Sequence, residues 1–181
     1  VDPALATEAY RRLLLPNADF VRLPMLWKAI EPQEQQHAWA ATDEWVDFLR
    51  RVRVPIIGGP LVRFHEGTIP DWLYIWEHDY ETVRDLLYEH INRVVTRYGS
   101  QVALWSAVCG LHVNAQFSFS FDQLMDLTRM AVGIVKKYNA NGRTMIELTQ
   151  PWGEYYATNQ RSIPPMLYAE MVVQSGVQFD V

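Results

Sequence analysis

The stretch YETVRDLLYEHINRVVTRYGSQVALWSAV, residues 80–108, decides the fold class. Residues 80–98 repeat apolar side chains three and four positions apart, which predicts an amphipathic helix. The repeating positions are Val83, Leu86, Leu87, Ile91, Val94 and Val95. After Gly99, residues 101–108 form a short apolar run that is typical of a strand buried on both faces. A long helix leading into a buried strand is the repeating unit of a parallel α/β sheet.

The same alternation extends in both directions along the chain. Strands are predicted near residues 19–27, 54–65, 101–108, 143–150 and 176–181, and helices near residues 4–15, 43–52, 80–98, 119–139 and 163–176. The segments between successive strands are long enough for parallel crossover connections. We therefore predict one α/β domain over residues 1–181, in which an initial helix is followed by four strand–helix units and a final strand.

Composition restricts the classes of function. The chain has 181 residues, 49% of them hydrophobic and 20% charged, so it can bury a sizeable core. Its net charge of −5 argues against nucleic acid as a partner. No run of 18 apolar residues is present, so we expect no membrane partner. The single cysteine, Cys109, excludes a disulfide within the chain.

Three segments carry a resemblance to a known family. They are Ile30–Gln33 with Trp39 and Asp43, similar to I-E-P-x-x-G-x-F-x-F-x-x-A-D; Gly58–His65 with Ile69–Trp72, similar to G-H-T-L-V-W-H-x-Q-x-P-x-W; and His90–Tyr98 with Val102 and Trp105, similar to H-I-x-x-V-V-x-R-Y leading into V-x-x-W-D-V-V-N-E. On these motifs the chain resembles the family 10 glycoside hydrolases, the (β/α)₈ barrel endo-β-1,4-xylanases.

The resemblance implies a fold, a ligand and a location for the protein. The predicted strands would be the second to sixth strands of a (β/α)₈ TIM barrel. Five strands form an arc that cannot close, so we expect a fragment whose remaining barrel strands come from the rest of the protein or from a partner chain. The resemblance further implies no cofactor, a β-glycan or oligosaccharide as ligand, and an extracellular or periplasmic location.

The family's catalytic groups are replaced or lie outside this chain. Retaining glycosidases use two carboxyl groups, one as acid/base and one as nucleophile. Where the resemblance places the acid/base, at the end of W-D-V-V-N-E, this chain has Gly110, preceded by Cys109. The family's nucleophile would fall beyond Val181. The polar anchors of its E-N-x-M-K-W motif are replaced in Arg22–Trp27, which keeps only Met-x-Trp.

Glu154 is the best candidate for a relocated acid. It lies beside Trp152 and Tyr155 after the predicted strand at 143–150, and aromatic neighbours can raise the pKa of a carboxyl group. The alternative is an exposed carboxylate, or one that is paired with Arg161. Glu147, inside the same strand, points either into the barrel or toward the helices, and we expect a structural pairing of Glu147 with Arg63.

Further candidates would bind sugar. Phe64 and His65 stand where the family has its W-H pair. His65 lies at the end of a strand, where barrel enzymes place functional groups, so it is a catalytic as well as a sugar-binding candidate. Trp72, Trp152 and Tyr155 could stack on sugar rings. The alternatives are a histidine that caps a loop and aromatic rings that only pack. Four other tryptophans are expected to pack in the core or between the helices and the sheet, namely Trp27, Trp39, Trp45 and Trp105.

Other chemistries remain open from the sequence. His65, Cys109, His112 and Glu154 fall at or after predicted strand ends and would suit a metal- or cysteine-dependent enzyme, although no tight ligand spacing is present. Because Gly110 offers no proton, the resemblance leads to two expectations: a glycoside-hydrolase-like protein that acts on or binds β-1,4-linked, xylan-like polysaccharide, or a non-catalytic structural or interaction module on a barrel scaffold.

Overall fold

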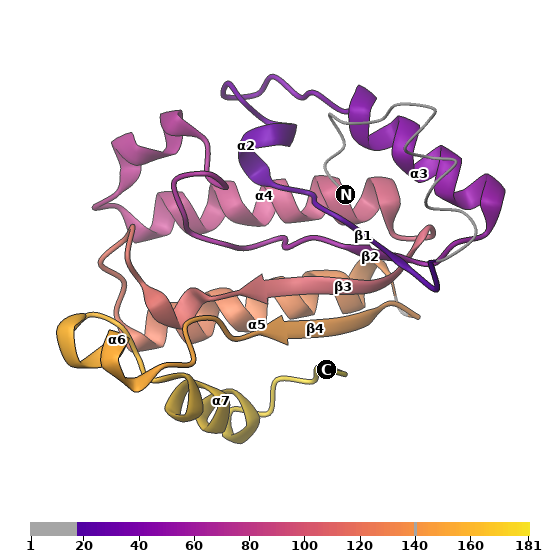
Figure 1. The fold of residues 1–181 in the computed structure, drawn as a ribbon. Helices are drawn as coiled ribbons and strands as arrows, with labels where there is room; N and C mark the ends of the chain where they lie inside the picture. Colours follow the sequence, from indigo (N-terminus) through magenta and orange to yellow (C-terminus); the bar gives the residue numbers. More distant parts are fainter. Residues whose placement is uncertain (1–17, 140) are drawn as a thin grey trace.

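The computed structural model describes residues 18–139 and 141–181, in which parallel strands alternate with helices (Figure 1). The strands are β1 (Val21–Leu23), β2 (Ile56–Gly58), β3 (Val102–Cys109) and β4 (Arg143–Glu147). They lie in the sheet in chain order, and each neighbouring pair is parallel. Sequential parallel strands joined by helical crossovers form an arc of a barrel wall. The predicted α/β parallel layout is confirmed.

The helices follow the predicted order. They are α2 (Trp27–Ile30), α3 (Ala40–Val52), α4 (Tyr80–Tyr98), α5 (Phe121–Tyr138), α6 (Gly153–Thr158) and α7 (Pro165–Gln174), with short 3₁₀ turns η2 (Asp71–Trp76) and η3 (Leu111–Val113). Side chains cap the two longest: Asp79 accepts a hydrogen bond from the Thr82 N–H (3.1 Å), and Ser120 forms a capping box with Gln123. The helix predicted over 4–15 lies outside the described residues.

The predicted strand at 54–65 is interrupted. Regular pairing ends at Gly58, and Val62 returns to the sheet through a bridge with Val108. Gly59 between them has φ +115, and a Cβ there would lie 2.5 Å from the carbonyl oxygen of Ser106. Only glycine fits so close to the neighbouring strand in this conformation. The chain therefore changes direction at this point and carries Arg63 and the residues after it to the edge of the sheet.

Two other strand predictions are corrected. The apolar run at 19–27 is a strand only to Leu23, and Trp27 already begins α2. Residues 177–181 form no regular strand but lie beside β4: the N–H groups of Asp180 and Val181 donate to the Thr144 carbonyl (2.8 and 3.1 Å), and the Ile146 N–H donates to that of Val181 (3.0 Å). The start of the predicted pairing is therefore present, without a continuous ladder.

The core lies between the sheet and the helices. Figure 1 shows α4 and α5 behind the strands. Three of the predicted core tryptophans, Trp27, Trp45 and Trp105, are buried, while Trp39 is half-buried and packs edge-on against Tyr98. Within 18–139 and 141–181, no helix combines the length and apolar character that crossing a bilayer requires.

Candidate functional site

The carboxyl ends of the strands meet at one edge of the sheet, as parallel pairing requires. Cys109, the last residue of β3, is in register with Glu147, the last residue of β4. Val62 bridges Val108, so the next residue, Arg63, comes beside Cys109. Neighbours in register project to the same face of a sheet. Arg63, Cys109 and Glu147 therefore form one row across three neighbouring stretches of chain.

The carboxylate of Glu147 is held from two sides. Its Oε1 accepts hydrogen bonds from Arg22 Nη2 and Ser106 Oγ. Arg22 lies on β1, three strand spacings from β4, which is about 14 Å in a flat sheet. The two side chains can meet because the sheet curves, so they project from its concave face. That face is the one that would line the inside of a barrel.

The expected pairing of Glu147 with Arg63 is wrong, because the ion-pair partner is Arg22. Arg22 reaches across the curved face from the first strand, and Arg63 affects Glu147 only through its charge. The open question of direction is also settled: Glu147 points into the arc rather than toward the helices. Curvature of the sheet, which strand patterning does not reveal, decides the partner.

The environment keeps Glu147 ionised. Burial works to raise the pKa of Glu147, but hydrogen bonds from Arg22 and Ser106 and the charges of Arg22 and Arg63 outweigh it, so the pKa is lowered. A carboxyl group with a lowered pKa carries no proton at neutral pH and is a poor general acid. Glu147 is thus an anchor for the arginine, not a replacement proton donor.

Cys109 has the opposite environment. Burial raises the pKa of its thiol, and the nearby carboxylate of Glu147 adds to the effect. A raised pKa disfavours the thiolate that nucleophilic or metal-binding cysteines need. The cysteine-dependent alternative therefore lacks an activated nucleophile at this position.

Gly110 has a left-handed backbone conformation that leaves little space for a side chain. Its φ is +66, and its N–H donates to the carbonyl of Glu147 (2.9 Å). A Cβ at this position would lie 2.6 Å from Thr149 Oγ1. The place where the resemblance puts an acid/base residue thus has neither the side chain nor the room for one.

Glu154 lies apart from the concave row described above. It is exposed in the first turn of α6, and within the described part of the chain it makes no hydrogen bond or ion pair, including with Arg161. Trp152 beside it is 69% exposed, and the Tyr155 ring packs edge-on against Tyr156. Tyr155 and Arg161 help to line a depression of about 440 Å³, to which Glu154 and Trp152 do not contribute. The predicted acid and Trp152 are therefore exposed outside this depression.

His65 and Phe64 have well-defined local contacts. His65 Nδ1 accepts a hydrogen bond from the Gly67 N–H (3.2 Å), which leaves the proton of a neutral ring on Nε2. Its backbone carbonyl accepts from Thr68 and from Ile69, so His65 also closes this turn. Phe64 packs against Phe117, with ring centroids 4.8 Å apart. His65 is exposed at the edge, while Phe64 is half-buried.

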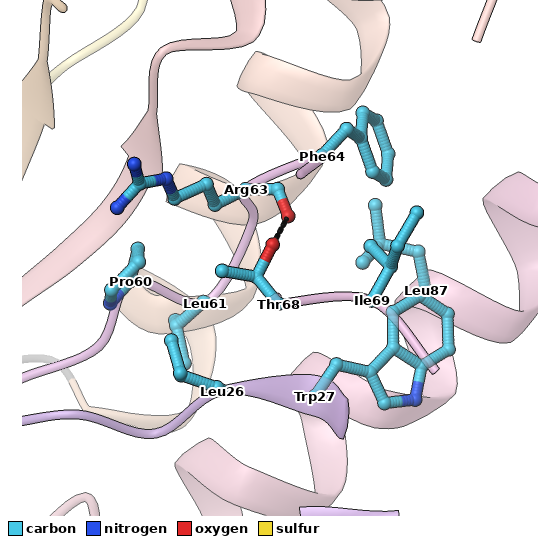
Figure 2. A pocket seen from close by; sticks show the side chains of 9 residues that line it. All are labelled: Leu26, Trp27, Pro60, Leu61, Arg63, Phe64, Thr68, Ile69 and Leu87. Carbon is cyan, nitrogen blue, oxygen red and sulfur yellow. Dashed lines mark hydrogen bonds between the residues drawn. The ribbon is translucent and has the colours of Figure 1, made fainter. Parts of the chain in front are cut away.

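A small cavity beside these residues is too small for a sugar. It measures about 10 Å³ and is lined by Leu26, Trp27, Pro60, Leu61, Arg63, Phe64, Thr68, Ile69 and Leu87. Figure 2 shows the guanidinium of Arg63 pointing away from the apolar side chains of this cluster, while the backbone carbonyl of Arg63 accepts a hydrogen bond from Thr68. Such a volume is about that of one water molecule. This cavity therefore cannot hold a saccharide.

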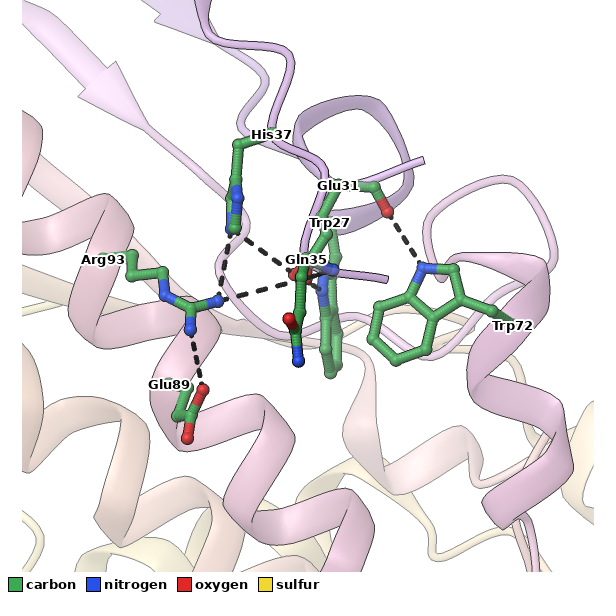
Figure 3. Close-up of polar contacts among 7 residues, drawn as sticks. All are labelled: Trp27, Glu31, Gln35, His37, Trp72, Glu89 and Arg93. Atoms are coloured by element: carbon green, nitrogen blue, oxygen red, sulfur yellow. Dashed lines mark hydrogen bonds and ion pairs between the residues drawn. The ribbon is translucent and has the colours of Figure 1, made fainter. Parts of the chain in front are cut away.

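Trp72 and the motif around Glu31 are tied together structurally (Figure 3). The indole of Trp72 packs edge-on against Trp27 and donates to the Glu31 carbonyl oxygen (3.1 Å). The buried Glu31 carboxylate accepts from Trp27 Nε1 (3.0 Å) and from the Gln35 N–H (2.8 Å), and His37 Nε2 lies 3.8 Å from it. The segment that carries part of the family resemblance thus anchors a loop to α2.

The metal alternative is not supported. Across the described residues, no three or more His, Cys, Asp or Glu side chains are grouped to hold a metal ion, so His65, Cys109, His112 and Glu154 are not assembled. Both ring nitrogens of the buried His112 are used: Nδ1 lies 3.2 Å from the Ile163 carbonyl, and Nε2 accepts from the Thr149 N–H (3.1 Å). Burial also lowers the pKa of His112. It is a structural histidine.

Sequence reasoning missed the roles of Arg22 and Ser106. The resemblance gives Arg22 only as the replacement of a family anchor, and no motif singles out Ser106. The available signal was a charged residue inside a strand of otherwise buried type, which requires a partner or solvent. That signal does not say which carboxylate is the partner, because Arg22 and Glu147 are 125 positions apart.

The sequence is similar to those of known glycoside hydrolases. The sequence model of glycosyl hydrolase family 10 matches residues 22–121, more than half of the chain. Endo-1,4-beta-xylanase A from Caldicellulosiruptor sp. (strain Rt8B.4) is 31% identical over 91 residues, which cover 45% of this chain and 13% of that protein.

Solved structures share the fold. Xylanase 10B from Thermotoga maritima superposes with a TM-score of 0.72 at 16% identity, over 97% of this chain and 54% of its own. A mutant structure in complex with xylotriose gives 0.72 at 23% identity, over 98% and 56%. The chain therefore spans about half the length of these structures, as a partial (β/α)₈ barrel does. With the motifs and the arc of parallel strands, these matches show that the chain belongs to glycosyl hydrolase family 10.

Proposed function

We propose that this chain is the glycan-binding half of a glycoside-hydrolase-like protein that takes β-1,4-linked polysaccharide of the xylan type on its concave face. Family membership and the row of polar groups at the carboxyl edge support this function. The xylotriose bound by a structural neighbour supports the class of ligand. The single observation that carries the proposal is that arginines, a serine and a carboxylate converge where barrel proteins place their sites.

We propose further that hydrolysis is weakened or lost at the family position. Gly110 supplies no proton, and the lowered pKa of Glu147 makes it a poor donor. Retaining hydrolysis also needs a second carboxyl group about 5 to 5.5 Å from the first. Binding without efficient cleavage is therefore the function that these residues favour, and Glu154 is the residue that would supply an acid if cleavage occurs.

Trp152 lies outside the concave row, and we propose that its exposed ring extends the glycan site beyond that row. Trp152→Ala is expected to weaken the binding of xylo-oligosaccharides by about three- to tenfold, because a stacking face is lost. Because this ring is 69% exposed, the free energy of unfolding should change by no more than about 0.5 kcal/mol. Titration calorimetry measures the affinity, and Tyr138→Ala, at the far end of α5, is the aromatic control. Equal affinities for Trp152→Ala and the wild type would remove Trp152 from the site.

Substitution of Glu154 tests whether this residue supplies the acid for any remaining glycan hydrolysis. If the full protein releases reducing sugar from a panel of β-glycans, Glu154→Gln should lower the rate at least about 100-fold, which is the contribution of a general acid. Glu170→Gln, an exposed carboxylate on α7, should leave the rate unchanged. Release that survives Glu154→Gln would assign the acid role elsewhere, and no release from any glycan would reject hydrolysis while leaving binding to be measured.

The remaining barrel strands form a separate proposal. Apolar side chains are exposed on α7 and beside β4, namely Leu148, Met166, Leu167, Val173 and Val181. An arc of strands leaves open edges, which proteins cover. We infer that the rest of the barrel, from the same polypeptide or from a partner chain, packs against this side. The non-catalytic interaction-module alternative would use the same surface.

A further inference from the structure

We propose that the concave face recognises an anionic β-glycan through a carboxylate substituent, a uronic acid, and that Arg63 is the residue that binds this carboxylate. The inference rests on the proposed glycan-binding function and adds the charge class of the ligand. It is carried by the position and exposure of Arg63, and by the observation that its guanidinium forms no hydrogen bond or ion pair with any residue that the structure describes.

Hydrogen bonds hold the backbone that carries the Arg63 side chain. The Thr68 hydroxyl donates to its carbonyl (2.6 Å), and the preceding residue, Val62, exchanges backbone hydrogen bonds with β3: the Val62 N–H donates to the Ala107 carbonyl (3.1 Å) and the Cys109 N–H donates to that of Val62 (2.9 Å). The backbone at Arg63 is therefore held on both sides. Its side chain is exposed and, among the described residues, its guanidinium forms no hydrogen bond or ion pair.

The neighbouring charges compensate Arg63 only in part, through the charge of Glu147. The nearest carboxylate in the row is Glu147, and Arg22 and Ser106 already bind its Oε1. Glu66, three positions further along, contributes its charge at Tyr74, which stacks on Phe117 in the aromatic cluster. Arg22, Arg63 and Glu147 together carry a charge of +1, in a chain whose net charge is −5. A local positive excess inside an acidic protein attracts anions to that place.

The chemistry of a guanidinium selects the class of anion. Its planar donors match the two oxygens of a carboxylate, and such charge-assisted hydrogen bonds are about twice as strong as neutral ones. The hydroxyl groups of a neutral xylan chain need only uncharged partners, so they do not account for a second arginine on this face. A uronic acid side group supplies the missing negative charge on the same polymer.

The test compares two ligands on the full protein by titration calorimetry at pH 7 and low salt. One is xylotetraose carrying a glucuronic acid, and the other is the same molecule with the carboxyl reduced to an alcohol. We expect the acidic ligand to bind about tenfold more tightly. Arg63→Gln should abolish that preference with little change in the affinity for the reduced ligand. The exposed Arg129→Gln on α5 is the matched control and should keep the preference.

The outcomes separate the two proposals. Affinity for the reduced ligand measures glycan binding, whereas the ratio of the two affinities measures recognition of the carboxylate. Equal affinities in the wild type, or a preference that survives Arg63→Gln, would overturn the inference and leave glycan binding in place. Failure of both ligands to bind would overturn both. A preference that Arg63→Gln removes and high salt weakens would establish the carboxylate site.

Discussion

Gly110→Ala is expected to lower the free energy of unfolding by about 2–5 kcal/mol. A side chain at φ +66 costs about 1–2 kcal/mol, and forcing a methyl group into occupied space costs about 1–3 kcal/mol more. The added Cβ would lie 2.6 Å from Thr149 Oγ1 and 3.3 Å from its Cγ2, so Thr149 would have to move. Urea denaturation of the wild type and the variant measures the change.

A second substitution separates the two causes. Thr149→Ala removes the closest atom, so Gly110→Ala in that background should cost only the backbone part, about 1–2 kcal/mol. A cost that is the same in both backgrounds would show that the Thr149 contact contributes nothing. A cost below about 0.5 kcal/mol in the wild type would contradict the left-handed conformation of residue 110.

This prediction bears on how activity could be restored. Returning glutamate to position 110 supplies a proton donor but meets the same Cβ overlap as alanine. Gly110→Glu alone should therefore yield a destabilised protein rather than an efficient hydrolase. On the proposed function, in which position 110 supplies no acid, one substitution would therefore not be enough to introduce one.

His90→Phe is expected to remove much of the acid sensitivity of the fold. His90 is fully buried against Trp27, with ring centroids 4.8 Å apart, and neither ring nitrogen has a hydrogen-bond partner among the residues that the structure describes. Burial, with the nearby charges of His37 and Arg93, lowers the pKa of His90 to about 3. Below pH 6.5 the unfolded chain binds a proton that the folded chain does not, so stability falls as the pH falls toward 3.

The size of the expected loss of stability follows from the lowered pKa of His90. Between pH 6.5 and pH 4 the wild type should lose about 3 kcal/mol relative to His90→Phe, at about 1.4 kcal/mol for each pH unit. At pH 7 the variant should be equal to or slightly more stable than the wild type, because two buried polar atoms without partners are removed. Urea denaturation of the two proteins at pH 7, 5 and 4 measures the difference in stability at neutral pH and its change with pH.

A matched histidine provides the control. The His78 side chain is 91% exposed, so His78→Phe should keep the pH dependence of the wild type. Lowered carboxyl pKa values, such as those of Glu147 and Asp43, contribute to acid unfolding in all three proteins and cancel in the comparison. Parallel pH profiles for the wild type and His90→Phe would show that His90 is solvated or hydrogen-bonded in the folded protein.

Part of the candidate site could be anticipated from the sequence. The strand-end position of His65, the absence of an acid at Gly110 and the exposure of Trp152 each follow from local pattern or from the resemblance. The grouping of these residues could not be anticipated. Glu154 lies in an exposed turn away from the concave row, and Trp72 is committed to packing on Trp27 and to the Glu31 carbonyl.

The amino-acid sequence alone determined the order of strands and helices and the family, because apolar periodicity and short motifs are local properties of a chain. Only the tertiary structure decided that Glu147 binds Arg22, that the Arg63 guanidinium forms no hydrogen bond or ion pair within residues 18–139 and 141–181, and that a Cβ at Gly110 would overlap Thr149. These facts depend on how strongly the sheet curves and on which strands it brings face to face. Curvature arises from the packing of the whole arc, which no single segment encodes.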